Sequence, residues 1–337
     1  MIGYVTRRLG HAVLTWLVAV TLIFLAMRVL PGNPLLTRFG QHPDAAQIER
    51  LRQENGWDRP LLVQLGEFFY KLFTSGDLGE SIARGGTSVS AELAERIPAT
   101  VELTICALLL AIPLGIAAGV ISAQARGRWP DWVFSSLALV GVSIPIFFLG
   151  MLLREVFVGL PVSQRLPATE FAFEPITGLF LIDVLLRGRF DLIGPVIAHL
   201  LLPAVTLSTV PAASIAKITR SAMLEALYAN YVRTAGAKGA SWWRIVWRHA
   251  LPNAAVPVAN ISGLQVGLLL TGAVLTETVF DWPGLGKYIA DAVVSDKDYA
   301  VVQAGAIVIA AWFALLNLLL DLVYMWLDPR IRLEDGR

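Results

Sequence analysis

The residue types that could carry enzyme chemistry are few and scattered in this sequence. Ser143 is a conceivable nucleophile, but no histidine or lysine base can be assigned to it, so we interpret it as a helix-packing or path-lining residue. The single cysteine, Cys106, lies in an apolar run and is interpreted as a small buried hydrophobe. The histidines have no carboxylate or cysteine at the spacing of metal ligands: His11, His42, His199 and His249. We therefore predict no catalytic residue and no metal site.

The glycine pattern does not indicate nucleotide chemistry either. A phosphate-binding loop needs two glycines separated by four residues, followed by lysine and a hydroxyl residue. The nearest match, Gly284-Leu285-Gly286-Lys287, lacks both the first glycine at that spacing and the hydroxyl residue. We expect no cofactor on this chain, so any ATP must be bound by another chain.

The most specific stretch is the basic segment 220–252, and its chemistry is that of protein docking. Asn230 is a good N-cap residue and Gly239 suits the left-handed position that ends a helix, so we expect a short helix over residues 231–238. This helix has little apolar face to bury, and its small residues would allow a soluble partner to pack closely against its backbone. Ser241 can cap a second helix, whose tryptophans favour a membrane interface.

The elements that must position this segment are apolar helices. The chain is 56% hydrophobic and 16% charged, a balance that a water-soluble core cannot easily hide. The first apolar stretch covers about 31 Å as a helix, which matches the hydrocarbon thickness of a bilayer. We expect an all-α membrane protein with six transmembrane helices: Leu9–Val29, Ala99–Ala123, Trp132–Val158, Gly194–Ile218, Ala254–Val279 and Val301–Leu327.

The distribution of charge, rather than the net charge of +1, orients the chain. The segments that lie inside when both termini are cytoplasmic are rich in lysine and arginine, whereas the rest of the chain carries a net negative charge. Short basic loops stay on the cytoplasmic side of a membrane. We therefore place both termini of this lipid-embedded chain in the cytoplasm. The charge gives no indication of a nucleic-acid partner.

The outer segment 31–98 is too polar to span a membrane and predicts two short helices. Asp44 with Gln47 forms a capping-box pattern, and Gly56 can end that helix. Pro60 suits the first position of a second, amphipathic helix. This second helix either lies on the outer membrane surface or packs on the transmembrane domain, and the sequence leaves both open.

Polar and small residues inside the spans indicate how the helices pack and what could line a path. Glu102 and Glu277 lie near outer helix ends, where snorkelling to the headgroups is the leading interpretation. Two glycine pairs predict close helix contact: Gly115 with Gly119, and Gly263 with Gly267. Prolines in the spans can bend helices around a cavity: Pro113, Pro145, Pro203, Pro211 and Pro257. The candidate path-lining residues, which helix-to-helix hydrogen bonding explains equally well, are Ser143, Asn260, Ser262 and Gln265.

The ordered motifs of the chain resemble one family over nearly its entire length. The run from Tyr231 to Gly239 looks like the EAA loop of binding-protein-dependent ABC importer permeases, and Gly239 and Leu251-Pro252 keep that loop's spacing. The stretch from Thr177 to Asp183 resembles dipeptide-type members. The wider landmarks resemble the dipeptide, oligopeptide and nickel permeases: Arg7-Arg8-Leu9, Leu30-Pro31-Gly32-Asn33-Pro34, Gly76-Asp77-Leu78-Gly79-Glu80-Ser81, Ile97-Pro98-Ala99-Thr100, Gly263-Leu264-Gln265-Val266-Gly267, Thr276-Glu277-Thr278-Val279-Phe280, Trp282-Pro283-Gly284-Leu285-Gly286 and Asp328-Pro329-Arg330-Ile331-Arg332.

This resemblance implies a type I ABC importer permease fold in the bacterial inner membrane. It implies an N-terminal helix with a periplasmic segment at 1–98, and a core permease domain at 99–330. The implied partners are a homologous second permease, two cytoplasmic ATPase subunits that hold ATP and Mg, and a periplasmic solute-binding protein that meets the outer segments 31–98 and 281–300. The residues implied to form a coupling helix for the ATPase, with the downstream Leu-Pro pair, are Tyr231, Val232, Arg233, Thr234, Ala235, Gly236, Ala237, Lys238, Gly239, Leu251 and Pro252.

The implied function is that of a permease subunit, without catalytic activity of its own, in an ATP-driven importer of dipeptides or oligopeptides. The sequence does not distinguish these cargoes from a nickel chelate or another small solute. An ion-coupled secondary transporter of small solutes is the alternative. It would need inverted repeats or broken helices around a coupling-ion site, and the sequence shows neither convincingly.

Two positions depart from the family pattern. Gly236 stands where the family usually has arginine, and Asn33 where it usually has aspartate. A glycine inside a helix costs about 1 kcal/mol relative to a better helix former, so we expect the short helix at 231–238 to depend on its partner for order.

Overall fold

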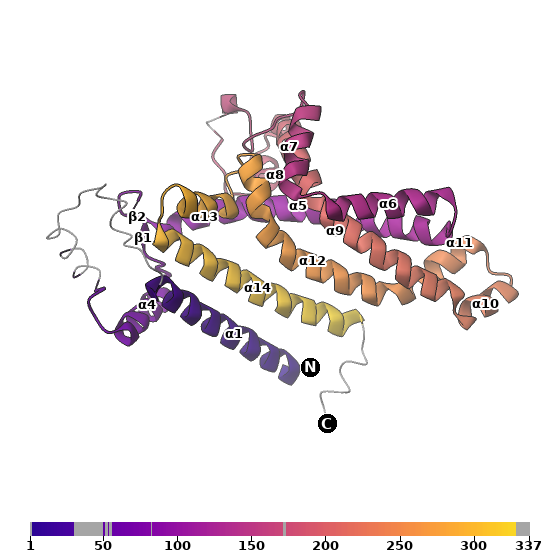
Figure 1. Cartoon of the computed structure of the whole chain (residues 1–337), viewed down its shortest axis with the longest axis horizontal. Coiled ribbons are helices and arrows are strands. Elements are labelled where there is room, and N and C mark those ends of the chain that lie inside the picture. The colour runs from indigo at the N-terminus through magenta and orange to yellow at the C-terminus, as the bar shows by residue number, and fades with distance from the viewer. Residues whose placement is uncertain are drawn as a thin grey trace. The chain divides into compact units, whose positions relative to one another are not determined.

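The computed structural model describes residues 2–29, 50, 53, 56–81, 83–170 and 173–327, and its regular structure is almost entirely helical (Figure 1). The expected helix near Asp44 and Gln47 lies outside the described residues. A two-stranded antiparallel hairpin pairs Glu80 with Ser88. The elements in chain order are α1 (Ile2–Val29), α4 (Leu61–Ser75), β1 (Glu80–Ser81), β2 (Thr87–Ser88), α5 (Val89–Gln124), α6 (Trp129–Ser143), α7 (Ile146–Val156), η1 (Ala168–Glu170), α8 (Phe180–Leu186), η2 (Phe190–Leu192), α9 (Ile193–Tyr228), α10 (Asn230–Ala237), α11 (Trp242–Arg244), η3 (Ile245–Ala250), α12 (Leu251–Val279), α13 (Leu285–Val294) and α14 (Tyr299–Leu327).

The helices include enough long apolar segments for a multi-pass membrane protein. Four segments in the described part of the chain can each cross a bilayer by length and composition: Val5–Val29, Val89–Gln124, Phe190–Tyr228 and Tyr299–Leu322. Two bent pairs raise the number to six if each pair is one span, namely α6 with α7, and Trp242–Leu269 with Ala273–Val279. The all-α membrane fold is thus as predicted, and the predicted six spans are consistent with it.

The third predicted span, Trp132–Val158, is not one straight helix. α6 ends at Ser143 and α7 begins at Ile146, and the two helices are bent by 108° at this break. Ile144 adopts an extended conformation, with φ −76° and ψ 126°. The cause is Pro145, because proline disfavours the helical conformation of the residue that precedes it.

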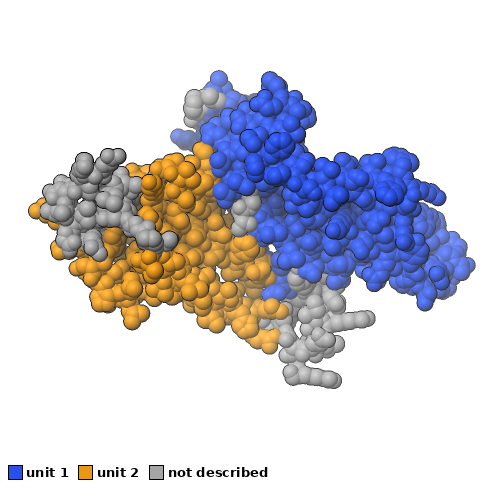
Figure 2. Space-filling model, in the orientation of Figure 1, with its two compact units in different colours: residues 1, 100–282, 319–337 blue, residues 2–99, 283–318 orange. Residues whose placement is uncertain are grey.

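The contacts within the chain divide it into two compact units (Figure 2). One unit comprises residues 1, 100–282 and 319–337, and the other comprises residues 2–99 and 283–318. The segment 283–318 therefore groups with the N-terminal part of the chain, from which it is distant in sequence.

In the unit that contains residues 100–282, α9 packs against α12, α6 and α7. α5 also approaches α9 closely, at two glycines. A Cβ atom added at Gly115 would lie 2.8 Å from the carbonyl oxygen of Ala212, and one at Gly119 would lie 2.6 Å from that of Ala216. Real Cβ atoms essentially never come this close to backbone oxygen, so the close helix contact predicted for this glycine pair is confirmed, and its partner is α9.

In the other unit, α4 packs along α1 in the opposite direction. The ring centroids of Phe24 and Phe68 are 5.4 Å apart, and those of Trp16 and Phe73 are 6.2 Å apart. A later residue of α4 thus meets an earlier residue of α1. α4 therefore packs on α1, which contains a candidate membrane span, whereas its placement on the outer membrane surface stays a prediction.

Candidate functional site

The predicted docking helix is α10, which follows α9 after the single residue Ala229. Ala229 is the N-cap residue and has no capping side chain. The prediction that Asn230 caps the helix is wrong, because the helix begins one residue earlier and Asn230 is already its first member. Gly239 has a φ of +79° and donates its N–H to the carbonyl of Gly236 at 2.9 Å. The predicted glycine stop is confirmed.

α10 exposes most of its surface. Val232 is buried, with 6% of its surface exposed, and Ala235 is half-buried. The other predicted coupling residues of this segment are exposed: Tyr231, Arg233, Thr234, Gly236, Ala237, Lys238 and Gly239. A helix this short is marginal in water without packing. Its position therefore depends on the chain that flanks it.

The chain that flanks α10 packs into one apolar cluster. Its buried members come from α5, α9, η3 and α12: Val120, Ala123, Met223, Ala226, Val246, Ala250 and Ala254. η3 is a π-helix that continues directly into α12, and the predicted Leu251-Pro252 pair forms the first turn of α12. Leu251 packs on the cluster, whereas Pro252 is exposed. The exposed helix is thus held between spanning helices that are themselves closely packed.

Packing does not require a glycine at position 236. A Cβ atom there would find Ile245 Cδ1 at 3.9 Å, an ordinary van der Waals contact. We expect Gly236→Ala to stabilise α10 by about 1 kcal/mol, because alanine is the better helix former. Hydrogen–deuterium exchange of the α10 amides should then slow by about fivefold. Gly239→Ala is the control, since alanine is strained at a φ of +79°, and it should not slow exchange. Unchanged or faster exchange in Gly236→Ala would contradict the prediction.

The predicted path-lining residues lie on two helices. Ser143 is the last residue of α6, beside the break, and its hydroxyl donates to the Leu139 carbonyl at 2.8 Å. The other three lie on α12, where Asn260 is exposed and Gln265 is buried. Ser262 donates to the Val258 carbonyl at 2.7 Å. Their assignment to a path stays a prediction.

The two intramembrane glutamates are buried within the protein, so the snorkelling interpretation is wrong for both. Glu102 is 4% exposed and Glu277 is 0% exposed. Glu277 accepts a hydrogen bond from the Thr100 hydroxyl. Glu102 pairs with Arg165 and accepts the Leu181 N–H at 2.8 Å. Each carboxylate has a partner inside the fold, which removes the need to reach the headgroups.

Sequence reasoning missed Arg165. Its guanidinium lies 3.6 Å from the ring centroid of Phe180 and 5.6 Å from that of Trp282, and it donates to the Gly178 carbonyl at 2.7 Å. Burial lowers the pKa of Arg165, and the charge of Glu102 opposes this effect. The two partners are 63 residues apart in sequence, so no local pattern could have indicated the pair.

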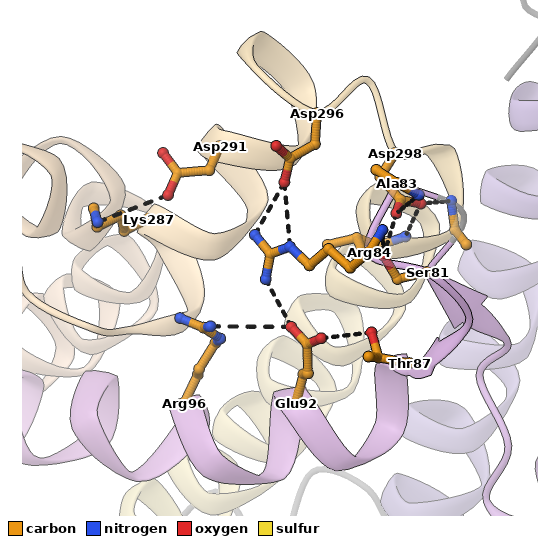
Figure 3. A network of polar contacts seen from close by, with 12 residues as sticks. Ser81, Ala83, Arg84, Thr87, Glu92, Arg96, Lys287, Asp291, Asp296 and Asp298 are labelled. Carbon is orange, nitrogen blue, oxygen red and sulfur yellow. Dashed lines mark hydrogen bonds and ion pairs between the residues drawn. The ribbon is translucent and has the colours of Figure 1, made fainter. Parts of the chain in front are cut away.

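A polar network connects the hairpin β1–β2 with the segment that precedes α14 (Figure 3). Arg84 pairs with Glu92 at 2.7 Å and with Asp296 at 3.0 Å. Burial lowers the pKa of Arg84, but hydrogen bonds to Asp296 and Glu92 raise it by more. Asp298 is buried, accepts the Ser81 hydroxyl at 2.6 Å, and also accepts the Ala300 N–H in the first turn of α14. The network therefore joins parts of the two segments predicted to meet a binding protein.

Comparison with known proteins agrees with this architecture. Residues 111–333 match the family of binding-protein-dependent transport system inner membrane components. Residues 1–104 match the N-terminal region of binding-protein-dependent transport system membrane components. Together the two matches cover nearly the whole chain.

Relatives of the same length are transport permeases. The dipeptide transport system permease protein DppB of Alkalihalophilus pseudofirmus is 41% identical over 340 residues, covering 98% of this chain and 100% of the relative. The di/tripeptide transport system permease protein DppB of Pseudomonas aeruginosa is 43% identical, covering 98% and 99%. The glutathione transport system permease protein GsiC of Pectobacterium atrosepticum is 37% identical, again covering 98% and 99%.

The fold has a solved counterpart in the inward-facing MetNI methionine ABC transporter. The TM-score is 0.52 at 17% identity, and the match covers 71% of this chain and 97% of the other. The resemblance at this identity concerns the fold, which is that of a type I ABC importer permease. The chain therefore belongs to the family of binding-protein-dependent transport system inner membrane components, and it is a multi-pass permease subunit of an ABC importer in the inner membrane.

Proposed function

We propose that this chain pairs with a homologous second permease to form the path through which an ATP-driven importer moves dipeptides and oligopeptides into the cell. A periplasmic binding protein delivers the cargo. Two cytoplasmic ATPase subunits bind ATP and Mg and carry out hydrolysis, while this chain has no catalytic role and holds no cofactor. The names of the relatives support this class of cargo, because they are described as dipeptide, di/tripeptide and glutathione permeases.

The observation that carries the proposal is the placement of α10. This helix is exposed along its small residues, yet it lies between α9 and the π-helix that leads into α12. A groove on an ATPase subunit could hold such a helix closely. Movement of the ATPase subunits would then shift α10, and with it α9 and α12. Because α12 carries Asn260, Ser262 and Gln265, a shift of this helix would change the access to the path.

The test is to fill the exposed face of α10 with a large side chain. Ala237 is exposed, so Ala237→Trp should leave the fold intact but block docking. We expect ATP-driven uptake of labelled dipeptide in proteoliposomes that contain the whole importer to fall by more than about tenfold, in the range of typical coupling energies. Ala237→Ser, which keeps the side chain small, should transport like the wild type.

Retained uptake in Ala237→Trp would remove α10 from the mechanism. Uptake driven by an ion gradient in vesicles that lack any ATPase would instead indicate the ion-coupled alternative. The same preparations can be assayed for both.

A further inference from the structure

The α5–α6 turn, by which we mean residues 124–131 from the last residue of α5 to the first turn of α6, contacts the chain on both sides of α10. Its strongest contact is made by Asp131, which is 6% exposed. Arg220 of α9 donates two hydrogen bonds to this carboxylate, from Nε at 2.7 Å and from Nη2 at 2.8 Å. Within the turn itself, the Gly127 N–H donates to Asp131 at 2.9 Å. The hydroxyl of Ser122 in α5 donates to the same carboxylate. One carboxylate thus joins the end of α5, the turn and α9.

Two further contacts of the same turn lie closer to α10. The guanidinium of Arg126 lies 5.3 Å from the ring centroid of Tyr228, the last residue of α9. On the other side of α10, the indole N–H of Trp242 donates to Gln124 Oε1 at 3.0 Å. The turn therefore touches the chain before α10 twice and after α10 once.

The contacts on both sides of α10 limit how this helix can move. α10 buries little surface of its own, so a force on it displaces the residues at its ends before it displaces the spanning helices. If both ends were free, α10 could move while the helices stayed in place. Contacts of the turn on both sides of α10 prevent such independent movement. Any displacement of α10 must then also move α9, α11 and the start of α6.

We propose that the α5–α6 turn, which we call the brace, holds the coupling helix at both ends and transmits its displacement to α5 and α6. Asp131 and Trp242 act as positioning residues. The inference rests on the proposed function of α10. It assigns to residues 124–131 a part in coupling that goes beyond the docking helix itself. Without the brace, the ATPase would still bind α10 and hydrolyse ATP, but less of the movement would reach the helices.

The test measures uptake per ATP hydrolysed in proteoliposomes that contain the complete importer. Asp131→Asn weakens the pairing with Arg220, and we expect the ratio to fall by roughly tenfold, within the usual range of coupling between sites. Trp242→Phe removes the indole donor but keeps an aromatic ring, and a roughly threefold fall is expected for one hydrogen bond. ATP hydrolysis itself should stay near the wild-type rate, which distinguishes coupling from loss of assembly.

Matched controls are available in the same chain. Trp243→Phe makes the same change at the adjacent residue. Trp243 is 71% exposed, and its ring centroid lies 5.1 Å from that of Trp247. Asp191→Asn removes the charge of an aspartate paired with Arg189, but on an exposed surface. Both controls should keep the wild-type ratio.

The possible results are distinct. Lower ratios in Asp131→Asn and Trp242→Phe with normal controls support the brace. If both variants keep the wild-type uptake per ATP hydrolysed while Ala237→Trp loses uptake, the brace is overturned and the proposed function stays intact. If the Asp131→Asn importer fails to assemble, the uptake per ATP hydrolysed of Trp242→Phe, compared with that of Trp243→Phe, decides the question. A wild-type importer without ATP-driven uptake removes the proposed function and this inference together.

Discussion

Replacing Arg165 with methionine is expected to lower the free energy of unfolding by about 3–5 kcal/mol. The change leaves the Glu102 carboxylate buried, with its side chain 5% exposed, and without its counter-ion. Methionine would still fill part of the space beside Phe180 and Trp282, so the loss comes mainly from the uncompensated charge. Thermal unfolding of the purified permease complex in detergent, followed by tryptophan fluorescence, measures the effect.

The chain offers two controls for this prediction. Arg189 pairs with Glu170 and Asp191, but its side chain is 44% exposed, so Arg189→Met should change the melting temperature little. The double variant Glu102→Gln with Arg165→Met should recover part of the loss, because a neutral amide is less costly to bury than a carboxylate. An unchanged melting temperature in Arg165→Met would contradict the buried pair.

Replacing Gly119 with leucine is the second large effect that we expect. The new Cβ would lie 2.5 Å from the Thr219 Cβ and 2.6 Å from the Ala216 carbonyl oxygen, so α5 and α9 would have to separate. Overpacking of this kind costs about 1–3 kcal/mol, and more when the obstacle is backbone. The amount of folded permease in the membrane, measured by detergent extraction and gel filtration, should fall sharply.

Gly194→Leu is the matched control for Gly119→Leu. Gly194 lies on α9, and a Cβ atom there would find no heavy atom within 4 Å. This variant should accumulate like the wild type. If both variants behaved alike, the close approach of α5 and α9 at Gly119 would be refuted.

Features set by residues that are close in the sequence could be predicted, whereas features set by distant residues could not. The end of α10 at Gly239 was predictable because a left-handed glycine is a local signal. The contact at Gly115 and Gly119 was predictable because two small residues one turn apart leave few other roles in an apolar helix. The N-cap at Ala229 was not predictable, because Asn230 is the better capping residue and the shift by one residue depends on how α9 ends.

Two other features lay beyond local reasoning. Hydropathy counts apolar residues without regard to direction, so it predicts one span over α6 and α7 and does not predict the 108° bend between them. The partners of the buried carboxylates come from distant segments, as in the pairing of Glu102 with Arg165. Such a carboxylate resembles a snorkelling one until its partner is known. The contacts of the 124–131 turn with Arg220 and Trp242 are of the same long-range kind.

The break after Ser143 would also have an electrostatic consequence for the predicted path. A helix carries about half a negative charge at its C-terminal end, where its last carbonyl groups point away from the helix. The 15 residues of α6 cover about 22 Å, less than the thickness of a bilayer core, so this end lies at membrane depth. Carbonyl groups at that depth must face protein or water rather than lipid. If the predicted path runs beside Ser143, these carbonyl oxygens could accept hydrogen bonds from the positively charged amino group of a peptide, without any acidic side chain.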